Sequence, residues 1–152
     1  MAVSIPQYAQ RMANAVPGLL YGTTQWVVDT KKAGEDIAFG APLFAVAADG
    51  HEVVAKDATK ALKLLGVAGF VQNVDGCYKD DRPVNCVREG YIYVQMAGTI
   101  AENEEVYVKY ADGTFVSKTV ADAGTSGDYV ALNAHAIEAG ASNAIVPIYI
   151  RG

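Results

Sequence analysis

The chain has 152 residues, of which 51% are hydrophobic, and this length suits one domain that buries its own core without metals or disulfides. Its formal net charge of −5 argues against a nucleic-acid-binding protein, because such a protein needs a basic face. No segment approaches the roughly 20 consecutive apolar residues that cross a bilayer, and no signal peptide is indicated, so we expect no membrane partner and a location in the cytoplasm or in a particle assembled there.

Residues 1–24 are predicted to form an arm ahead of a β domain over residues 25–152. The first 28 residues contain Arg11 and no acidic residue, whereas the remaining chain carries all 17 acidic residues. Short segments vary in charge by chance, but an apolar, acid-free segment ahead of an acidic body is typical of a segment that packs on something else.

A short helix is expected within the arm. Ser4 opens a capping box, and Pro17-Gly18 ends the helical pattern. Tyr8, Met12 and Val16 recur at helical spacing and form a single stripe. A helix of about ten residues is marginal alone in water. The stripe must therefore dock on the β domain or on a neighbouring molecule.

The rest of the chain predicts about eight strands, with turn signals between them. Runs of β-branched and aromatic residues alternate with clusters of Gly, Asp, Asn and Pro. This spacing favours an all-β fold, a compact Greek-key or jelly-roll-like barrel or sandwich, over alternating βα units. We expect strands within residues 25–30, 41–47, 66–72, 84–96, 106–110, 129–137 and 144–150.

Four local features are expected within this pattern. Asp57–Leu65 has the spacing of a short helix capped by its first residue, or it is a loop that turns into the next strand. A bulge is expected near Glu89-Gly90. Ala121–Gly127 is expected to be a flexible loop. Pro147 marks an edge strand or a bulge, because proline lacks the donor that a sheet ladder needs.

The sequence indicates no metal and no other cofactor. Cys77 and Cys86 flank a polar loop and are expected to remain free thiols, because the expected compartment is not oxidising. Their spacing does not fit a zinc knuckle, and His51 and His135 lack a nearby third ligand. The acidic turns lack the alternating oxygen donors of a calcium loop.

Gly124–Asp128 is a candidate catalytic segment, because Ser126 stands there in a Gly-rich turn. A Ser–His–Asp site would need His51 or His135 as the base and Asp128 as the orienting acid. The strand–turn–helix context of a nucleophile elbow is missing from the pattern before this serine. We interpret it as an ordinary loop serine and expect no enzyme activity.

Tyr91 and Tyr93 share one face of the strand predicted within residues 84–96, and nine tyrosines occur in the chain. Tyrosine is common at interfaces because it buries a ring and keeps a polar tip. It is equally common in cross-strand pairs within one sheet. Both interpretations remain open, so these two residues form a candidate interface face.

Residues 78–94 read YKDDRPVNCVREGYIYV, and GTIAENEEVYVKY follows from Gly98. This stretch resembles the structural cement, or capsid decoration, proteins of tailed bacteriophages. In that family a Tyr and a polar turn precede a strand, a basic-Gly step leads to an aromatic-rich strand, and a small-residue turn enters a Val-Tyr-Val strand. These places are taken here by Tyr78, Pro83-Val84, Arg88-Glu89-Gly90, Tyr91–Val94 and Val106-Tyr107-Val108.

The likeness extends over most of the chain as loose patterns. Val16–Leu20 resembles the arm of that family, and Gly66-Val67-Ala68 resembles its central strand. Glu102–Glu105 departs from the pattern, because Gly-Asp-Pro is commoner there. That difference alters one turn and leaves the expected fold unchanged.

The resemblance implies a virion structural protein on the exterior of the capsid. Its partners would be the major capsid protein and a second or third copy of itself, as a homodimer or homotrimer. It would clamp neighbouring capsid subunits after the shell expands, with its arm in contact with them. The candidate arm contacts are Ile5, Tyr8, Met12, Val16, Leu19, Leu20 and Tyr21.

Two other classes were weighed. A carbohydrate-binding, lectin-like β module would use the same β body and would need Tyr91 and Tyr93 on an exposed aromatic platform. A small hydrolase would need Ser126 and a histidine. We favour the capsid decoration protein over both.

Overall fold

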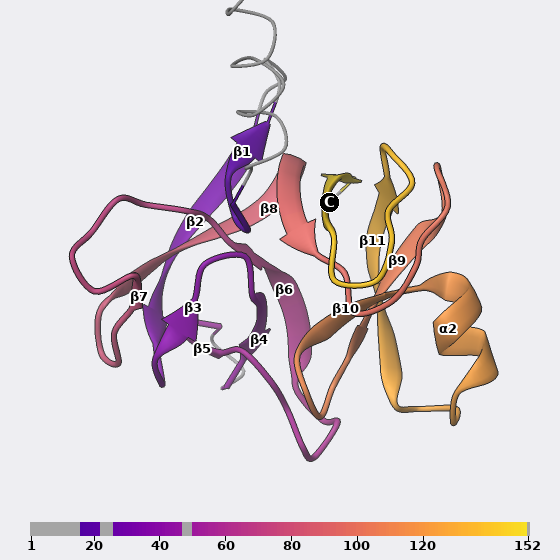
Figure 1. The fold of residues 1–152 in the computed structure, drawn as a ribbon. Helices are drawn as coiled ribbons and strands as arrows, with labels where there is room; N and C mark the ends of the chain where they lie inside the picture. Colours follow the sequence, from indigo (N-terminus) through magenta and orange to yellow (C-terminus); the bar gives the residue numbers. More distant parts are fainter. Residues whose placement is uncertain (1–15, 22–25, 47–49, 152) are drawn as a thin grey trace, which may run out of the picture.

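The computed structural model describes residues 16–21, 26–46 and 50–151, and this part of the chain is built almost entirely from β-strands (Figure 1). The strands are β1 (Leu20–Tyr21), β2 (Val27–Ala33), β3 (Ile37–Ala38), β4 (Pro42–Ala45), β5 (Glu52–Val54), β6 (Lys63–Ala68), β7 (Cys77–Tyr78), β8 (Pro83–Gln95), β9 (Glu105–Lys109), β10 (Thr114–Ser117), β11 (Tyr129–Ala136) and β12 (Ile145–Ile150). One short helix, α2 (Lys118–Ala123), follows β10.

β8, with 13 residues, belongs to two closed rings of strands. In the first ring, the N-terminal barrel, β8 pairs with β2 and β6, and β5 and β4 complete the circuit. In the second ring, the C-terminal barrel, β12, β11, β9 and β10 follow from β8, and a parallel bridge between Met96 and Phe115 closes the circuit. Figure 1 shows the two barrels on either side of β8. The predicted all-β barrel class is confirmed.

β8 changes its neighbours at Gly90. Up to Glu89 it pairs with β2 and β6, and from Gly90 onward it pairs with β12 and β1. The register with β2 skips Arg88, so the bulge predicted near Glu89-Gly90 is confirmed. Gly90 has a φ of 121°, and a Cβ there would lie 2.2 Å from Cδ1 of Trp26. Glycine therefore lets the strand pass from one barrel into the other.

The two barrels have separate cores, but side chains from strands of both barrels pack together in the C-terminal core. Phe44, Val67 and Val87 come from strands of the N-terminal barrel but pack into the core of the C-terminal barrel. Separating the barrels would expose this apolar surface to water. The N-terminal core contains Ala33, Ile37, Leu43, Val53, Ala68, Tyr78, Val84 and Cys86. The C-terminal core includes Ile92, Val94, Met96, Val106, Val108, Phe115, Leu132, Val146 and Ile148.

Every strand predicted from the sequence overlaps an observed strand. The face predicted to hold Ile92 and Val94 is confirmed, since both are fully buried, whereas the other face is mixed, with Gln95 exposed and Tyr93 buried. The strands that the sequence pattern missed include β1, β3, β5 and β7, which have only two or three residues each. Such short strands carry too few residues to show an alternation.

The helix considered for Asp57–Leu65 was wrong, and the alternative of a loop turning into a strand is correct, since β6 begins at Lys63. Asp57 does cap backbone donors, but within a turn. Its carboxylate accepts hydrogen bonds from the N–H groups of Thr59 at 3.0 Å and of Ala61 and Leu62 at 2.8 Å each. A carboxylate satisfies the donors of a helix and of a turn equally well, so the cap alone does not identify a helix.

Two further expectations need correction. Ala121–Gly127 is not all loop, because α2 occupies Lys118–Ala123, with the Ser117 side chain accepting a hydrogen bond from Val120 N as its N-cap. Pro147 lies on β12, an inner strand between β11 and β8, and not at an edge or bulge. Pro147 lies at the end of the pairing with β11, where its carbonyl accepts a hydrogen bond from Ile137 N at 2.9 Å, so the donor that it lacks falls at the end of the ladder.

Because both barrels share β8 and contribute side chains to the C-terminal core, we predict a single unfolding transition. Ile92→Ala in the C-terminal core and Leu43→Ala in the N-terminal core should each lower the free energy of unfolding by about 2–5 kcal/mol. Urea titrations followed by fluorescence of the single tryptophan, Trp26, and by circular dichroism should give coincident curves. The fully exposed Val74 supplies a control, Val74→Ala, with an effect within about 0.5 kcal/mol. Separate transitions for the two probes would contradict this coupling of the barrels.

Asp57 predicts a dependence of stability on pH. Burial alone would raise the pKa of its carboxyl, but hydrogen bonds from Thr59, Leu62 and Ala61 outweigh burial and hold this pKa below its usual 3.8. A carboxyl whose pKa is lowered by folding stabilises the protein above its unfolded pKa, and this contribution is lost as the pH falls through the folded pKa. Wild type should therefore exceed Asp57→Asn in stability at pH 6, and the difference should shrink progressively below about pH 4. A difference that stays constant from pH 6 to pH 2.5 would refute this role.

Candidate functional site

The last part of the predicted arm, Val16–Tyr21, is held on the β body by its backbone, and we call it the arm root. Gly18 N donates a hydrogen bond to Tyr93 O at 2.7 Å, and Tyr93 N donates to Leu19 O at 3.0 Å. Phe70 N donates to Gly18 O at 2.7 Å. β1 then continues the pairing with β8. The arm root therefore touches β8 and the segment after β6, and its position is fixed by both.

Gly18 makes this close approach possible. Its φ is 84°, and a Cβ would lie 2.7 Å from Ala68 O, 2.7 Å from Gly40 N and 2.9 Å from Phe70 N. All three are backbone atoms, which cannot rotate away. Gly40 contributes from the other side, because its φ is 79° and a Cβ there would lie 2.4 Å from Pro17 Cβ. The Pro17-Gly18 pair, which the sequence analysis interpreted only as a helix stop, is also an attachment point.

The arm root presents apolar side chains to solvent. Val16 and Leu19 are each 37% exposed and Leu20 is 38% exposed, although the backbone around them is fixed. Phe70, whose N–H bonds the arm root, is 39% exposed. Tyr21 pairs with Tyr91 across β1 and β8. Of the predicted arm contacts, Ile5, Tyr8 and Met12 lie outside the described residues.

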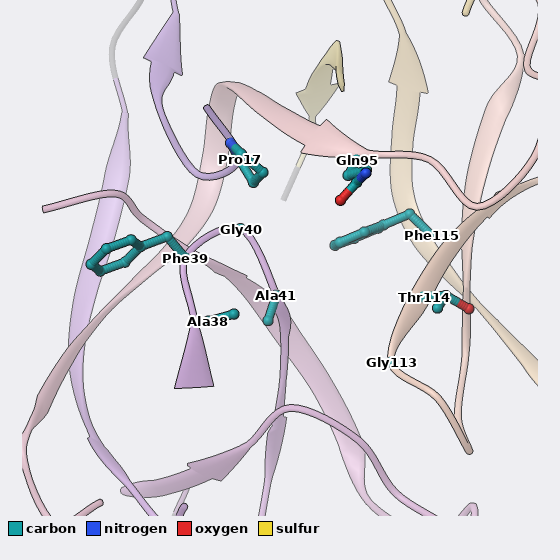
Figure 2. A pocket seen from close by; sticks show the side chains of 9 residues that line it. All are labelled: Pro17, Ala38, Phe39, Gly40, Ala41, Gln95, Gly113, Thr114 and Phe115. Carbon is teal, nitrogen blue, oxygen red and sulfur yellow. The ribbon is translucent and has the colours of Figure 1, made fainter. Parts of the chain in front are cut away.

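A hollow of about 190 Å³ lies beside the arm root, between the two barrels (Figure 2). Figure 2 shows Phe39 on one side and Gln95 and Phe115 on the other, with Pro17 at the rim. Its volume is below the roughly 300–1,000 Å³ of typical small-molecule sites. It has room for one apolar side chain rather than for a cofactor. The hollow is lined by Pro17, Ala38, Phe39, Gly40, Ala41, Gln95, Gly113, Thr114 and Phe115.

Tyr91 lies in a cross-strand row that the sequence could not reveal. Tyr149 on β12 is its direct register partner, with ring centroids 4.8 Å apart, and His135 on β11 lies opposite Tyr149, with centroids 5.7 Å apart. Arg151 Nη1 lies 2.9 Å from Nδ1 of His135. Tyr93 is only 7% exposed. These positions favour cross-strand pairing for Tyr91, and a carbohydrate platform built from both tyrosines is disfavoured because Tyr93 is buried.

The residues of the weighed catalytic arrangement serve other contacts. Ser126 is exposed in the turn before β11, whereas His135 lies near the far end of that strand. Asp128 pairs with Lys60. Within the described ranges, no group of three or more His, Cys, Asp or Glu side chains could hold a metal ion. No helix in those ranges is long and apolar enough to span a membrane.

Both cysteines are free, and they differ in environment. Cys77 is half-buried at the edge of a polar loop, whereas Cys86 is fully buried in the N-terminal core. Burial raises the pKa of the Cys86 thiol to about 11. Because the thiolate is the reactive form, Cys86 is a packing residue and not a nucleophile.

The fixed arm root predicts a strong position dependence for Gly→Ala changes. Gly18→Ala should lower the free energy of unfolding by about 1–3 kcal/mol more than the same substitution at a left-handed glycine in open space. The reason is that a Cβ at Gly18 would overlap three backbone atoms. Gly50→Ala is the matched control, since Gly50 has a φ of 70° and no atom within 4 Å of the added Cβ. The control should show only backbone strain, about 1–2 kcal/mol. Equal losses for the two variants in urea unfolding would contradict the attachment.

One family model and two solved structures of phage proteins match this chain. The family model described as "Structural cement protein (E217 gp24/Pam3 gp6)" matches residues 5–151. A chain from the capsid of Myoviridae phage XM1 is similar in fold, with a TM-score of 0.70 and 15% identity over 91% of both chains. The head fiber gp8.5 N base of bacteriophage phi29 is similar over 83% of this chain and 94% of its own, with a TM-score of 0.51 and 16% identity. No curated protein sequence matches.

At these identities the two solved structures establish the likeness of fold, and the family model establishes the family. The model covers nearly the whole chain, including the arm root and all twelve strands. The resemblance inferred from Tyr78–Val108 is thereby confirmed. The chain belongs to the structural cement protein family and is a structural protein of the phage virion.

Proposed function

We propose that the protein decorates the outer surface of the major capsid protein lattice and stabilises the expanded shell by clamping neighbouring subunits. The observation that carries this proposal is the fixed arm root. Backbone hydrogen bonds hold Val16–Tyr21 on the β body, while the side chains of Val16, Leu19 and Leu20 remain exposed. An ordered backbone and exposed apolar side chains together suit a segment that docks on a partner.

The ordered backbone of the arm root lowers the conformational entropy that is lost when the arm binds a partner. Each side chain or loop that is already ordered loses less entropy when it docks, so more of the contact energy appears as affinity. Residues 1–15 continue from this root with no acidic residue. Segments that order on binding can cover a large surface with a short chain. The arm therefore supplies reach, and the rigid root sets its direction.

Many weak copies can stabilise a large shell. When each molecule bridges two subunits, the second contact is intramolecular and gains from a high effective concentration. A small body without enzymatic activity or nucleic-acid binding suffices for this task. The proposed partners are the major capsid protein and further copies of this chain, as homodimers or homotrimers on the capsid exterior.

Removal of the arm tests this function. Full-length protein should co-sediment with expanded shells that lack it, saturate at a fixed number of copies per capsid subunit, and raise the temperature at which the shells disrupt. Deletion of residues 2–15 leaves every described bond of the root intact and should weaken binding at least about tenfold, because the contacts of the arm are lost.

Two controls make the result specific. Circular dichroism must show that the truncated protein remains folded, and Val74→Ser, which alters an exposed apolar residue elsewhere, should bind as wild type does. If shell binding and shell stability are unchanged after the truncation, residues 2–15 do not contribute to binding. Absence of binding by the full-length protein would overturn the proposed function itself.

A further inference from the structure

The open edge of β2 is a self-association surface: we propose that two copies of the chain pair their β2 strands antiparallel across a two-fold axis at Asp29. This inference rests on the proposed function, because it names how the copies that decorate the shell join to one another. It is carried by the pairing pattern of β2, the exposure of its side chains and the distribution of its charges.

β2 has a partner along its whole length on one side only. β8 pairs with residues Val27 to Lys32, but on the other side β5 reaches only Lys32 and Ala33. Among the described residues, no strand pairs with Val27–Lys31 at this second edge. An unpaired edge of this kind is a ready template for another strand.

The open edge presents backbone donors and acceptors at alternate residues. Lys32 N donates to the O atom of His51, which directly precedes β5, whereas Ala33 N donates to Arg82 O on the opposite side. Because successive residues of a strand point their N–H and C=O groups to opposite sides, Val28 and Thr30 point theirs to the open edge. Both residues are β-branched, which favours the extended conformation.

The side chains at this edge are unusually apolar for an unpaired strand. Val27 is 41% exposed and Val28 is 44% exposed, more than any other large hydrophobic residue in the described ranges except Val74. Thr30 is also exposed. A lysine on an edge strand disfavours pairing with another strand. Lys32 already forms salt bridges with Asp81 at 2.9 Å and with Glu52 at 3.6 Å.

One antiparallel register between two β2 strands pairs the outward N–H and C=O groups of Val28 and Thr30. With Asp29 on the two-fold axis, Val28 of one copy lies opposite Thr30 of the other, and the same pair recurs on the other side of the axis. These pairs use the outward N–H and C=O groups of both residues. The paired segment runs from Val27 to Lys31 and stops before Lys32, where β5 begins to pair, so the second copy's chain must leave the edge at Trp26.

The charges fit the same register. The two Asp29 side chains face each other, and each already pairs with Arg88 of its own chain at 3.0 Å. The diagonal neighbour of Asp29 on the partner strand is Lys31, within reach of a long side chain. Two acids are thus surrounded by four basic groups, and the axis is not repulsive. A second copy therefore fits the edge better than a partner of one charge sign.

The paired strand is short, so the dimer should be weak in dilute solution and strengthened on a shell, where many copies are held together. Cross-linking tests the register directly. Cys86 is the direct register partner of Asp29 within the chain, so both native thiols must be removed before the test. In a Cys77→Ser, Cys86→Ala background, Asp29→Cys should form a disulfide-linked dimer on mild oxidation at high protein concentration, because the two residues face each other across the axis. Lys31→Cys, which lies opposite Val27 in this register, should remain monomeric.

Thr30→Pro provides an independent variant. It removes a donor from the open edge but none from the pairing with β8, so the fold should be retained, and sedimentation equilibrium should show association weakened at least about tenfold. A monomeric Asp29→Cys protein, equal cross-linking at residue 31, or a folded Thr30→Pro protein that associates like wild type would overturn the proposal.

Shell binding separates this inference from the proposed function. If wild-type protein co-sediments with shells but the Asp29→Cys variant gives no disulfide-linked dimer, in solution or on the shell, the β2 pairing is refuted and the decoration function stands. If the Asp29→Cys variant gives the dimer but wild-type protein fails to bind shells, the β2 pairing is supported and the decoration function is refuted.

Discussion

The structure depends on one strand that belongs to two barrels. β8 supplies Val84 and Cys86 to the N-terminal core and Ile92 and Val94 to the C-terminal core. A strand can do this only if it changes neighbours along its length, and Gly90 with the bulge at Arg88 allows that change. The same strand then offers Tyr91 and Ile92 to β1. The site of arm attachment is therefore a consequence of how the barrels are joined.

This arrangement explains how a small body can act as a rigid support. The arm root contacts the half of β8 that pairs with β12 in the C-terminal barrel, and it also contacts Phe70, which follows β6 of the N-terminal barrel. Under the proposed function, force applied to the arm would pass into β8, a strand that contributes side chains to both cores. A family whose members are structural cement proteins has an evident use for such a connection.

Local patterns made much of the fold predictable. The buried face of Ile92 and Val94 on β8 and the bulge near Gly90 are properties of neighbouring residues, and both were confirmed. The Asp57 cap was predicted correctly but assigned to the wrong element, because a carboxylate binds turn and helix donors alike. The six-residue helix α2 was not predicted, because its sequence signal, Ser117 followed by a short stretch with two alanines, is weak.

Properties that depend on distant residues could not be predicted. The bridge between Met96 and Phe115 and the row of Tyr91, Tyr149 and His135 require a register between strands that one sequence does not reveal. The open edge of β2 follows from where β5 begins to pair, which is also non-local. For the site, the apolar character of Val16, Leu19 and Leu20 was predictable, whereas their fixed backbone was not.

Electron cryomicroscopy of expanded shells decorated with the full-length protein would test the central claim most directly. The account predicts density for the two-barrel body on the outer surface, with the arm root in place on β8 and the preceding residues lying against a capsid subunit. Bodies bound through another face, with the arm root turned toward solvent, would contradict it.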